Sequence, residues 1–445
     1  MKILLVEPSY QNKYPPLGLM KLAKFHKLRG DDVSFVKGLD KDKRAEKWDR
    51  IYITTLFSFY WNITIKTINY YEFSAKDPKN IFIGGPMATI MAEEIEQKTG
   101  FTVIKGLLNE KDKINLPGEE NIDSIVPDYS ILNDISYKYP SSDAYFTYTT
   151  RGCVRKCEFC AVSTIEPQYI DYIPLKKQIH SINEEYGERK DLLLLDNNVL
   201  ASGRFEQIID EIKDIGFVKG AKLRNRHRYV DFNQGTDHRL LTKQKLKKLS
   251  EIPIRPLRIA FDMVHYKDAY IKCIEWAAEY GLLNLSNYIL YNYDDKPDEF
   301  YERLRINVEL NERLGTKTFS FPMKYVPTTA KDRKYVGKYW NRKYLRSIHC
   351  ILNATHGIVG PKLDFFEAAF GKDIREYRQI LLLPEDYIID RHKHSKNGAS
   401  DWNNLFTSLS EKYQNEFIDI ITENSFKKKS NSHIPAIMDL LKHYY

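Results

Sequence analysis

The chain has 445 residues, more than one compact core usually holds, so two or three domains are expected. Hydrophobic residues make up 42% and charged residues 29%, as in soluble globular proteins, and no apolar run reaches the roughly 18 residues that cross a bilayer. The net charge of +8 is too mild to indicate a nucleic-acid-binding protein, and five cysteines are too few for a disulfide framework. We therefore expect a protein of the reducing cytoplasm with no membrane partner.

Residues 1–130 are predicted to form a first domain around a doubly wound parallel sheet. Apolar, β-branched segments typical of strands alternate with segments whose apolar residues recur at helical spacing. The expected strands are 2–8, 31–38, 50–59 and 101–106, the expected helix is 16–30, and 80–100 should form a strand, a Gly-Gly turn and a helix. This βαβ alternation predicts helices on both faces of the sheet.

A second βα series is predicted after a polar connecting segment at 110–140. Six strand-like segments recur with about five helices between them, and polar or special residues follow each strand. The strands are expected at 144–150, 192–198, 229–237, 257–263, 286–295 and 318–327. Because active sites of βα barrels lie at the C-terminal ends of their parallel strands, these polar residues should face one cavity. From about residue 330 the chain is predicted to be mostly helical.

Three of the five cysteines lie within eight residues, directly after the strand at 144–150. Cys153, Cys157 and Cys160 have C-x3-C-x2-C spacing. A zinc site would need a fourth ligand nearby, and the one closely spaced histidine pair is far along the chain. A [4Fe–4S] cluster held by three thiolates would leave one iron open to a ligand. Three unrelated surface cysteines would be an oxidation liability, so the cluster is the favoured interpretation.

This spacing, with Phe159 before the third cysteine and a strand before the loop, resembles the radical S-adenosylmethionine (SAM) superfamily over residues 140–327. The resemblance implies a partial (β/α)6 barrel at 140–328 and a [4Fe–4S] cluster on Cys153, Cys157 and Cys160. It implies that SAM binds the open iron through its amino and carboxylate groups. An electron from a flavodoxin- or ferredoxin-type reductant would then cleave SAM, and the 5′-deoxyadenosyl radical would take a hydrogen atom from a substrate.

The resemblance also implies which residues contact SAM. Asp196 and Asn197 stand where the family has a Gly-Gly-Glu type motif, although the glycines are missing. Asp262 would face the ribose, and Asn292 replaces a glycine of the adenine-side motif. For each carboxylate the structural alternative is an N-cap of the next helix. The predicted cofactor residues are Phe159, Asp196, Asn197, Gln234, Asp262, Asn292, Phe321 and Met323, with Asp237 beside Gln234 and with Lys324 as a contact for a substrate carboxylate or phosphate.

Residues 1–130, at "YPPLGLMKLAKFHKLRG" and "IFIGGPMA", are similar to the cobalamin-binding-like domain of many radical SAM enzymes. In that domain a D-x-H-x-x-G loop can place a histidine beneath cobalt. Here Glu7-Pro8-Ser9-Tyr10 follows the first strand, and no such loop is present. We therefore expect the fold without the cofactor, capping the barrel mouth. The domains expected are 1–130, 140–328 and a helical extension at 329–445.

The remaining signals leave the substrate and the rival functions open. The basic stretch 219–228 is interpreted as a solvated loop, with phosphate contact as the alternative. Cys273 and Cys350 are predicted to be buried packing residues. The substrate could be a small molecule, a peptide or a nucleoside, free or in a nucleic acid. The alternative functions are a cobalamin-dependent methyltransferase and a non-catalytic, metal-containing nucleic-acid-binding protein.

Overall fold

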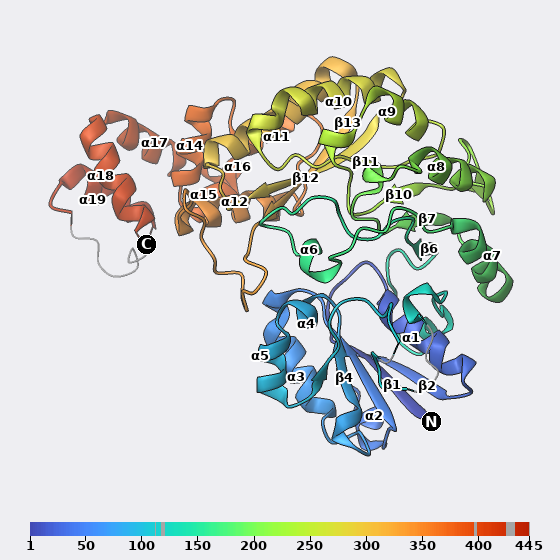
Figure 1. Ribbon diagram of the computed structural model, residues 1–445. Coiled ribbons are helices and arrows are strands. Elements are labelled where there is room, and N and C mark those ends of the chain that lie inside the picture. The colour runs from blue at the N-terminus through green and yellow to red at the C-terminus, as the bar shows by residue number, and fades with distance from the viewer. Residues whose placement is uncertain (112, 117–120, 396–397, 424–431, 445) are drawn as a thin grey trace. The chain divides into compact units, whose positions relative to one another are not determined.

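The computed structural model describes residues 1–445 except 112, 117–120, 396–397, 424–431 and 445 (Figure 1). The chain forms two compact units. The first contains residues 1–256 and 327–334, and the second contains residues 257–326 and 335–445. In the described parts of the chain, no helix has the length and apolar character needed to cross a membrane.

The first unit begins with the predicted doubly wound sheet, which is confirmed. Its five strands are all parallel, in the order β2-β1-β3-β4-β5. Their bounds are β1 Lys2–Glu7, β2 Asp32–Lys37, β3 Arg50–Thr54, β4 Ile81–Gly84 and β5 Thr102–Val103. The helices of this part are α1 Leu17–Leu28, α2 Lys41–Ala45, α3 Trp61–Tyr71, α4 Pro86–Ile90 and α5 Ala92–Thr99. Apolar side chains of β1, β3 and β4 pack with those of α3, α4 and α5 in one buried cluster, whereas α1 contacts β1, β2 and β3 separately.

The turn between β4 and α4 requires its glycine. Gly85 has φ +102°, and a Cβ there would lie 2.4 Å from the carbonyl oxygen of Thr55. Thr55 closes the turn, because its Oγ1 donates to the oxygen of Gly84 (2.9 Å) and accepts from the amide of Ala88 (2.9 Å). A tight strand-to-helix connection therefore explains the Gly-Gly pair.

A second, three-stranded parallel sheet follows in the same unit, in the order β10-β7-β6. Its strands are β6 Ala144–Thr147, β7 Asp191–Leu194 and β10 Val230–Phe232. Its helices are α6 Val162–Ile165, α7 Leu175–Tyr186, α8 Phe205–Asp214 and α9 Lys243–Leu249. The stretch 219–228, interpreted as a solvated loop, is mostly exposed but contains a short antiparallel hairpin of β8 Lys222–Leu223 and β9 Arg226–His227, and its last residue, Arg228, is buried. Its two turn residues both have positive φ, as tight two-residue hairpins require.

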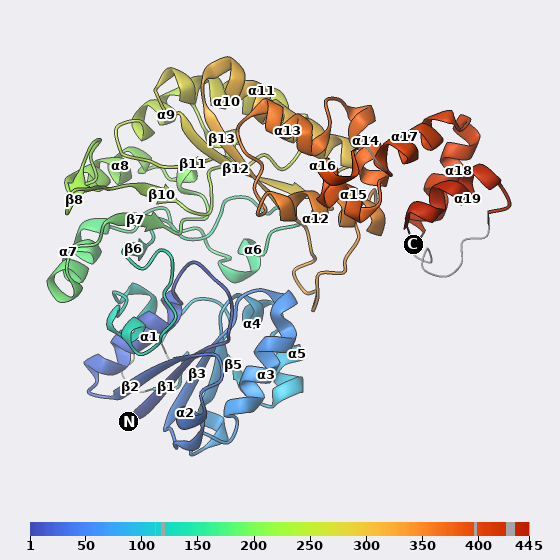
Figure 2. The ribbon, with the colours of Figure 1, turned by 180° about the vertical axis from the view of Figure 1, so that it is seen from behind.

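The second unit has its own three-stranded parallel sheet, in the order β11-β12-β13 (Figure 2). Its strands are β11 Leu257–Arg258, β12 Asn284–Tyr291 and β13 Lys317–Lys324, with α10 Lys267–Glu279 and α11 Pro297–Leu314 between them. The six strands expected for a barrel thus lie as two groups of three, one in each unit. The partial barrel and the predicted domain limits remain predictions.

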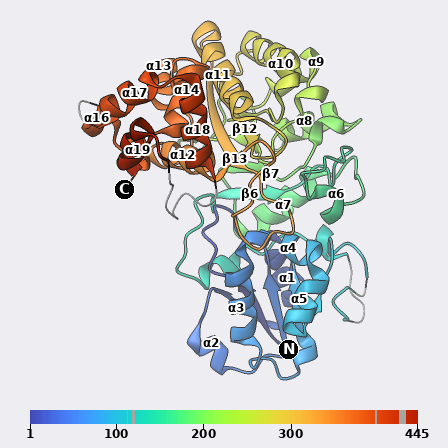
Figure 3. The same ribbon diagram turned by 90° about the vertical axis from the view of Figure 1, so that its left-hand side faces the viewer.

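The rest of the second unit is helical in the described residues, as predicted, and Figure 3 shows these helices in one group. They pack with α11 around a buried aromatic core that includes Trp340, Tyr377 and Trp402. Cys350 is buried in this core and Cys273 is buried on α10, which confirms both predictions. The helices are α12 Arg342–Ala354, α13 Leu363–Phe370, α14 Ile374–Leu382, α15 Glu385–Ile389, α16 Arg391–His394, α17 Ala399–Ser408, α18 Glu411–Thr422 and α19 Pro435–Leu441.

Candidate functional site

The three clustered cysteines lie on a loop that is closed at its base. Arg151 and Ile170 form an antiparallel bridge, with N–H···O distances of 3.1 and 2.9 Å in the two directions. Gly152 follows with φ +70°, and a Cβ there would lie 2.4 Å from the oxygen of Gln168. Only glycine fits such a close approach of two backbone segments. The loop therefore begins and ends at a fixed place, next to the C-terminal end of β6.

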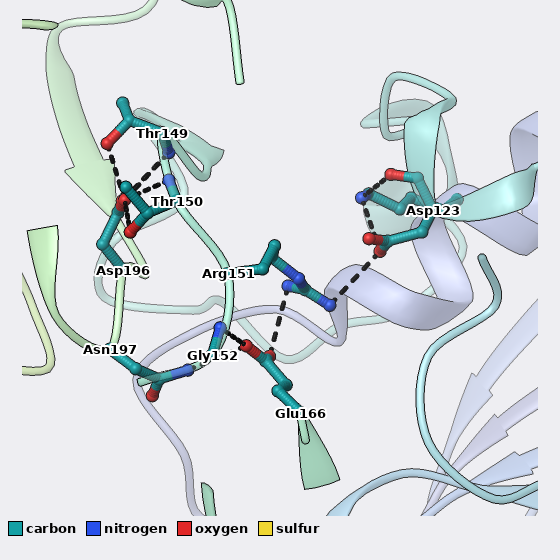
Figure 4. A network of polar contacts seen from close by, with 9 residues as sticks. Asp123, Thr149, Thr150, Arg151, Gly152, Glu166, Asp196 and Asn197 are labelled. Carbon is teal, nitrogen blue, oxygen red and sulfur yellow. Dashed lines mark hydrogen bonds and ion pairs between the residues drawn. The ribbon is translucent and has the colours of Figure 1, made fainter. Parts of the chain in front are cut away.

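Asp196, at the end of β7, holds the first residues of this loop. Its carboxylate accepts hydrogen bonds from the amides of Thr149 (3.0 Å) and Thr150 (2.5 Å) and from both threonine hydroxyls (2.6 and 2.7 Å). Figure 4 shows all of these donors around one carboxylate. Burial raises the pKa of Asp196, and the four hydrogen bonds act in the opposite direction. Asp196 does not cap a helix, so the N-cap alternative is wrong for this residue; its contact with a cofactor remains a prediction.

Glu166 holds the loop one residue further on. Its Oε2 accepts from the amide of Gly152 (2.6 Å) and from Nδ2 of Asn197 (2.9 Å), and its Oε1 lies 3.4 Å from Nη1 of Arg151. Neither Glu166 nor Arg151 was predicted as a site residue. The available signal was the position of Arg151, one residue before Gly152 in the strand-to-cysteine connection.

A buried row of alternating charges continues from Glu166 into the first domain (Figure 4). Arg151 lies 3.4 Å from Asp123, and Asp123 accepts from Nζ of Lys21 on α1 at 3.1 Å. The Arg151 guanidinium also stacks 3.9 Å from the Tyr148 ring centroid. Burial opposes ionisation of Asp123, yet the charges of Lys21 and Arg151 lower its pKa. The cysteine loop is thereby tied to the N-terminal sheet through charged side chains.

The ends of β7 and β10 also contact the cysteine segment itself. The sulfur of Cys153 accepts from the amide of Arg155 (3.3 Å) and from Nδ2 of Asn198 (3.4 Å). Asp237, after β10, is ion-paired with Nε of Arg155 at 3.1 Å. Polar residues at the ends of two neighbouring strands thus meet at this loop; that the strand ends face one cavity remains a prediction.

Gln234 was the other residue predicted at the end of β10. Its side chain is exposed, and its nearest hydrogen bond is to Oδ1 of Asn233 at 3.3 Å. Asn233 is buried instead, and its Nδ2 donates to the hydroxyl of Tyr14 (2.5 Å). The chain alternates sides along an extended segment, so the residue that faces inward is one position earlier than expected.

The cysteines have the chemistry that an iron–sulfur cluster needs. None of the five cysteines forms a disulfide, and Cys153, Cys157 and Cys160 are all half-buried. Among the described residues, no three His, Cys, Asp or Glu side chains converge closely enough to hold a single metal ion. A cubane cluster binds each thiolate at a different iron, so its ligands need not converge on one point. The two hydrogen bonds to the Cys153 sulfur would stabilise a thiolate.

In the second unit the predicted residues are placed as follows. Asn292 is buried with φ +68°, the left-handed conformation that a glycine would take. Its side chain contacts the oxygens of Tyr325 (3.0 Å) and Tyr335 (3.2 Å) and the amide of Gly337 (2.7 Å). Asn292 therefore fixes the chain after β13.

Of the other predicted residues of the second unit, Asp262 follows β11, and Phe321, Met323 and Lys324 lie on β13. Asp262 is half-buried, and its backbone oxygen accepts from the buried Arg303 (2.6 Å). Arg303 is ion-paired with Asp295 at 2.7 Å, a structural pair that the sequence analysis missed. Met323 is exposed, and the remaining predicted residues, Phe159 on the cysteine loop and Phe321 and Lys324 on β13, are half-buried.

A cavity of about 230 Å³ lies at the C-terminal edge of the N-terminal sheet. Arg151 and Glu166 form part of its wall, together with residues of α1, β3, β4, the β4–α4 turn, α4 and 104–108 and with Asp123, Tyr148 and Ile165. Apolar side chains such as Leu17, Ile53 and Phe82 predominate, and the lining contains no His, Cys or Met that could bind cobalt. Since drug-sized ligands usually need about 300–1,000 Å³, the cavity is too small to enclose a whole cobalamin.

Comparison with known proteins identifies a related fold. No protein-family model matches this sequence, and no curated protein matches it significantly. The solved structure of TsrM from Kitasatospora setae, a radical SAM methyltransferase with tryptophan and a SAM analogue bound, has 12% identity and a TM-score of 0.54. The match covers 78% of this chain and 76% of TsrM.

A second match is OxsB, a cobalamin-dependent SAM radical enzyme solved with aqua-cobalamin and SAM bound. It is 14% identical, with a TM-score of 0.50, and an apo form matches equally well at 13% identity. The match covers 69% of this chain but only 51% of OxsB, so the chain spans about half of that protein's length. These identities show a shared mixed α/β fold. They give no support to the expected loss of cobalamin, and none to a nucleic-acid partner.

Proposed function

We propose that this protein is a radical SAM enzyme that cleaves SAM reductively and abstracts a hydrogen atom from a substrate still to be identified. The observation that carries the proposal is the cysteine loop, which the polar ends of β7 and β10 hold in place. Asp196 and Glu166 fix its base, Asn198 contacts the sulfur of Cys153, and Asp237 binds Arg155. The shared fold of two SAM-binding enzymes supports the same conclusion.

Cys153, Cys157 and Cys160 would hold a [4Fe–4S] cluster as thiolates. When bound, the cluster supplies one electron, received from a flavodoxin- or ferredoxin-type donor, which breaks the C5′–sulfur bond of SAM into methionine and a 5′-deoxyadenosyl radical. The chain's own residues orient this chemistry. The amide of Arg155 and Nδ2 of Asn198 stabilise negative charge on Cys153, and Gly152 lets the loop turn against residues 166–170.

Metal analysis after anaerobic reconstitution with iron and sulfide tests the ligand assignment. We expect about four irons per chain in the wild type, since one cubane contains four. Cys157→Ala should lose most of the bound iron, whereas Cys273→Ala, which changes a buried cysteine on α10, should keep it. Equal iron in the two variants would contradict the assignment. Zinc without iron would favour the alternative of a non-catalytic metal-binding protein.

A cobalamin-dependent methyl transfer is the second candidate, and the cavity beside Arg151 and Glu166 favours it. Its apolar wall could take one arm of a cobalamin, and a cofactor held there would need no cobalt ligand from the lining residues. Absorbance spectra after incubation with hydroxocobalamin and gel filtration test this candidate. Retained corrinoid absorbance, lost in a cavity-filling Leu107→Trp variant, would support it. A colourless corrinoid-free protein would leave hydrogen abstraction as the proposed reaction.

A further inference from the structure

The first unit contains a second cavity, of about 460 Å³, near the N-terminal end of β6. Its wall comes from the segment 129–143, from the residues around the end of α7 and from the tip of the β8–β9 hairpin. Asp143, one of its lining residues, lies directly before β6, whereas the cysteines follow the C-terminal end of β6. The cavity shares no residue with the cysteine loop, so it does not belong to the site described above.

Tyrosines form much of this wall, and their hydroxyl groups bond to the protein. The hydroxyl of Tyr129 donates to the oxygen of Ala144 (3.2 Å) and accepts from the amide of Phe146 (3.0 Å). The hydroxyl of Tyr137 donates to the oxygen of Asn12 (2.8 Å). The hydroxyl of Tyr139 binds Glu7. These bonds fix the aromatic rings in place before any ligand arrives, which lowers the entropic cost of binding.

Positive charge exceeds negative charge around the cavity. Arg189, Arg224 and Lys138 line it, and none of them forms an ion pair with any residue that the structure describes. The Arg189 guanidinium lies 4.6 Å from the Tyr129 ring centroid, and its buried Nε has no hydrogen-bond partner. The one lining carboxylate, Asp143, is already ion-paired with Arg226 at 2.5 Å.

The hairpin separates the basic residues of 219–228 into those that anchor it to the protein and those that face the cavity or solvent. Arg228 is buried, where it pairs with Glu188 at 2.6 Å and stacks 4.0 Å from the Phe217 ring centroid. Arg226, on the second strand, pairs with Asp143, so Arg226 and Arg228 both anchor the hairpin. The turn, with φ +49° at Arg224, then presents Arg224 at the cavity. Lys222, on the first strand, is exposed and does not line it.

We propose that this cavity binds a nucleotide unit, with its phosphate on Arg189 and Arg224 and its base against the half-buried rings of Tyr137 and Tyr186. A phosphate monoester carries a charge of about −1.5 to −2, which suits a site with three cations and one neutralised carboxylate. Arginine guanidinium groups match phosphate geometry, and tyrosine rings accept stacked bases of any sequence. The volume lies within the range of about 300–1,000 Å³ that is usual for small-molecule sites.

Isothermal titration of the full-length protein with AMP tests the proposal, with adenosine, ribose 5-phosphate and a 5′-phosphorylated trinucleotide as comparison probes. AMP should bind more tightly than adenosine and ribose 5-phosphate, and its affinity should fall as the salt concentration rises. Arg224→Gln should weaken AMP binding by about tenfold or more, because it removes one charge-assisted contact. Lys222→Gln is the matched control on the same hairpin and should change it by less than about twofold.

The comparison probes also separate the sources of the nucleotide unit. Tighter binding of the trinucleotide than of AMP would identify a nucleic-acid end as the source, and the reverse would identify a free nucleotide. Equal binding of AMP and adenosine, equal effects of the two variants, or displacement of AMP by SAM would each overturn the proposal. The measurement needs no cluster, so its failure is distinct from a failure of the proposed reaction.

Discussion

Asp196 and Glu166 bind different partners at the base of the cysteine loop. Asp196 satisfies two buried backbone amides, those of Thr149 and Thr150, whereas Glu166 neutralises the buried Arg151 and accepts from Gly152. Both carboxylates act on backbone that directly precedes Cys153. They are therefore positioning residues, and their removal should reduce cluster retention through loop order.

Asp196→Ala should lower the free energy of unfolding by about 3 kcal/mol, since it leaves two buried N–H groups without acceptors. Asp196→Asn keeps one acceptor oxygen in the same place and should recover much of this loss. Urea unfolding of both variants, together with their iron content after reconstitution, measures the two effects. Identical behaviour of the alanine and asparagine variants would show that the amides of Thr149 and Thr150 do not depend on residue 196.

The Arg151–Glu166 pair should show energetic coupling, because removal of either partner leaves a charge in a buried place. We expect Arg151→Met and Glu166→Gln each to destabilise the protein by about 3 kcal/mol. The double variant should be less damaged than the sum of the single variants by at least about 1 kcal/mol. A double-mutant cycle from urea unfolding measures this difference, and strict additivity would show that the two residues do not interact.

Asn292 offers a test of backbone conformation. Its φ of +68° is easy for glycine and costs an alanine about 1–2 kcal/mol. Asn292→Ala and Asn292→Gly lose the same three side-chain hydrogen bonds, so only the backbone term differs between them. Thermal unfolding should show the glycine variant to be the more stable of the two. If the alanine variant proved more stable, the left-handed conformation at this position would be refuted.

At the scale of elements, α1 contains a histidine that couples stability to pH. His26 is buried, with Nδ1 2.7 Å from Asp31 and Nε2 3.0 Å from the hydroxyl of Tyr52. Burial lowers its pKa to about 4, and the hydrogen bond to Asp31 only partly opposes this shift. The unfolded chain binds a proton near the ordinary pKa of 6.5, whereas the folded protein stays neutral there. Stability is therefore complete above pH 6.5 and decreases as the pH falls toward 4.

Between pH 7.5 and pH 5 this histidine should cost the wild type about 2 kcal/mol of unfolding free energy. His26→Gln removes the titrating group, so its stability should fall by about that much less over the same interval. His180→Gln, a change on the exposed face of α7, should follow the wild type. Urea unfolding at the two pH values provides the comparison, and parallel pH profiles for all three proteins would contradict the assignment.

Local sequence patterns predicted helices and strands well where burial determines the residue types. They did so less well where contacts between distant parts of the chain determine the structure. The apolar strands of the first sheet and the glycine ends of α1 and α5 follow directly from the sequence. β11 is two residues long where 257–263 was expected, and α7 was not singled out. The hairpin at 222–227 was missed because Arg224 and Asn225 adopt positive φ in place of the usual glycine.

The same distinction between local patterns and distant contacts holds for the predicted site residues. The cysteine spacing is local, and therefore it identified the loop. Glu166 and Asn233 act through partners that are distant in sequence, namely Gly152, Asn197 and Tyr14, so no spacing could indicate them. Strand-end reasoning pointed to Asp196 and Asp237; Asp196 binds the amides of Thr149 and Thr150, whereas Asp237 caps the helical turn His238–Leu240, the structural alternative stated for the carboxylates.

At the scale of the whole molecule, the chain combines a doubly wound domain, two three-stranded parallel sheets and a helical C-terminal part in two compact units. The row from Lys21 through Asp123 and Arg151 to Glu166 connects the first domain with the cysteine loop inside one unit. A ligand bound in the cavity at the edge of the N-terminal sheet would contact the same row of charged residues, since Arg151 and Glu166 line that cavity.

Formation of 5′-deoxyadenosine tests the central claim most directly. The anaerobically reconstituted wild-type protein, reduced with dithionite and supplied with SAM, should release 5′-deoxyadenosine and methionine, as detected by liquid chromatography and mass spectrometry. Cys157→Ala should release neither above background, while Cys273→Ala should match the wild type. If the iron-loaded wild type leaves SAM intact, or if Cys157→Ala cleaves it equally well, the proposed enzyme class is wrong.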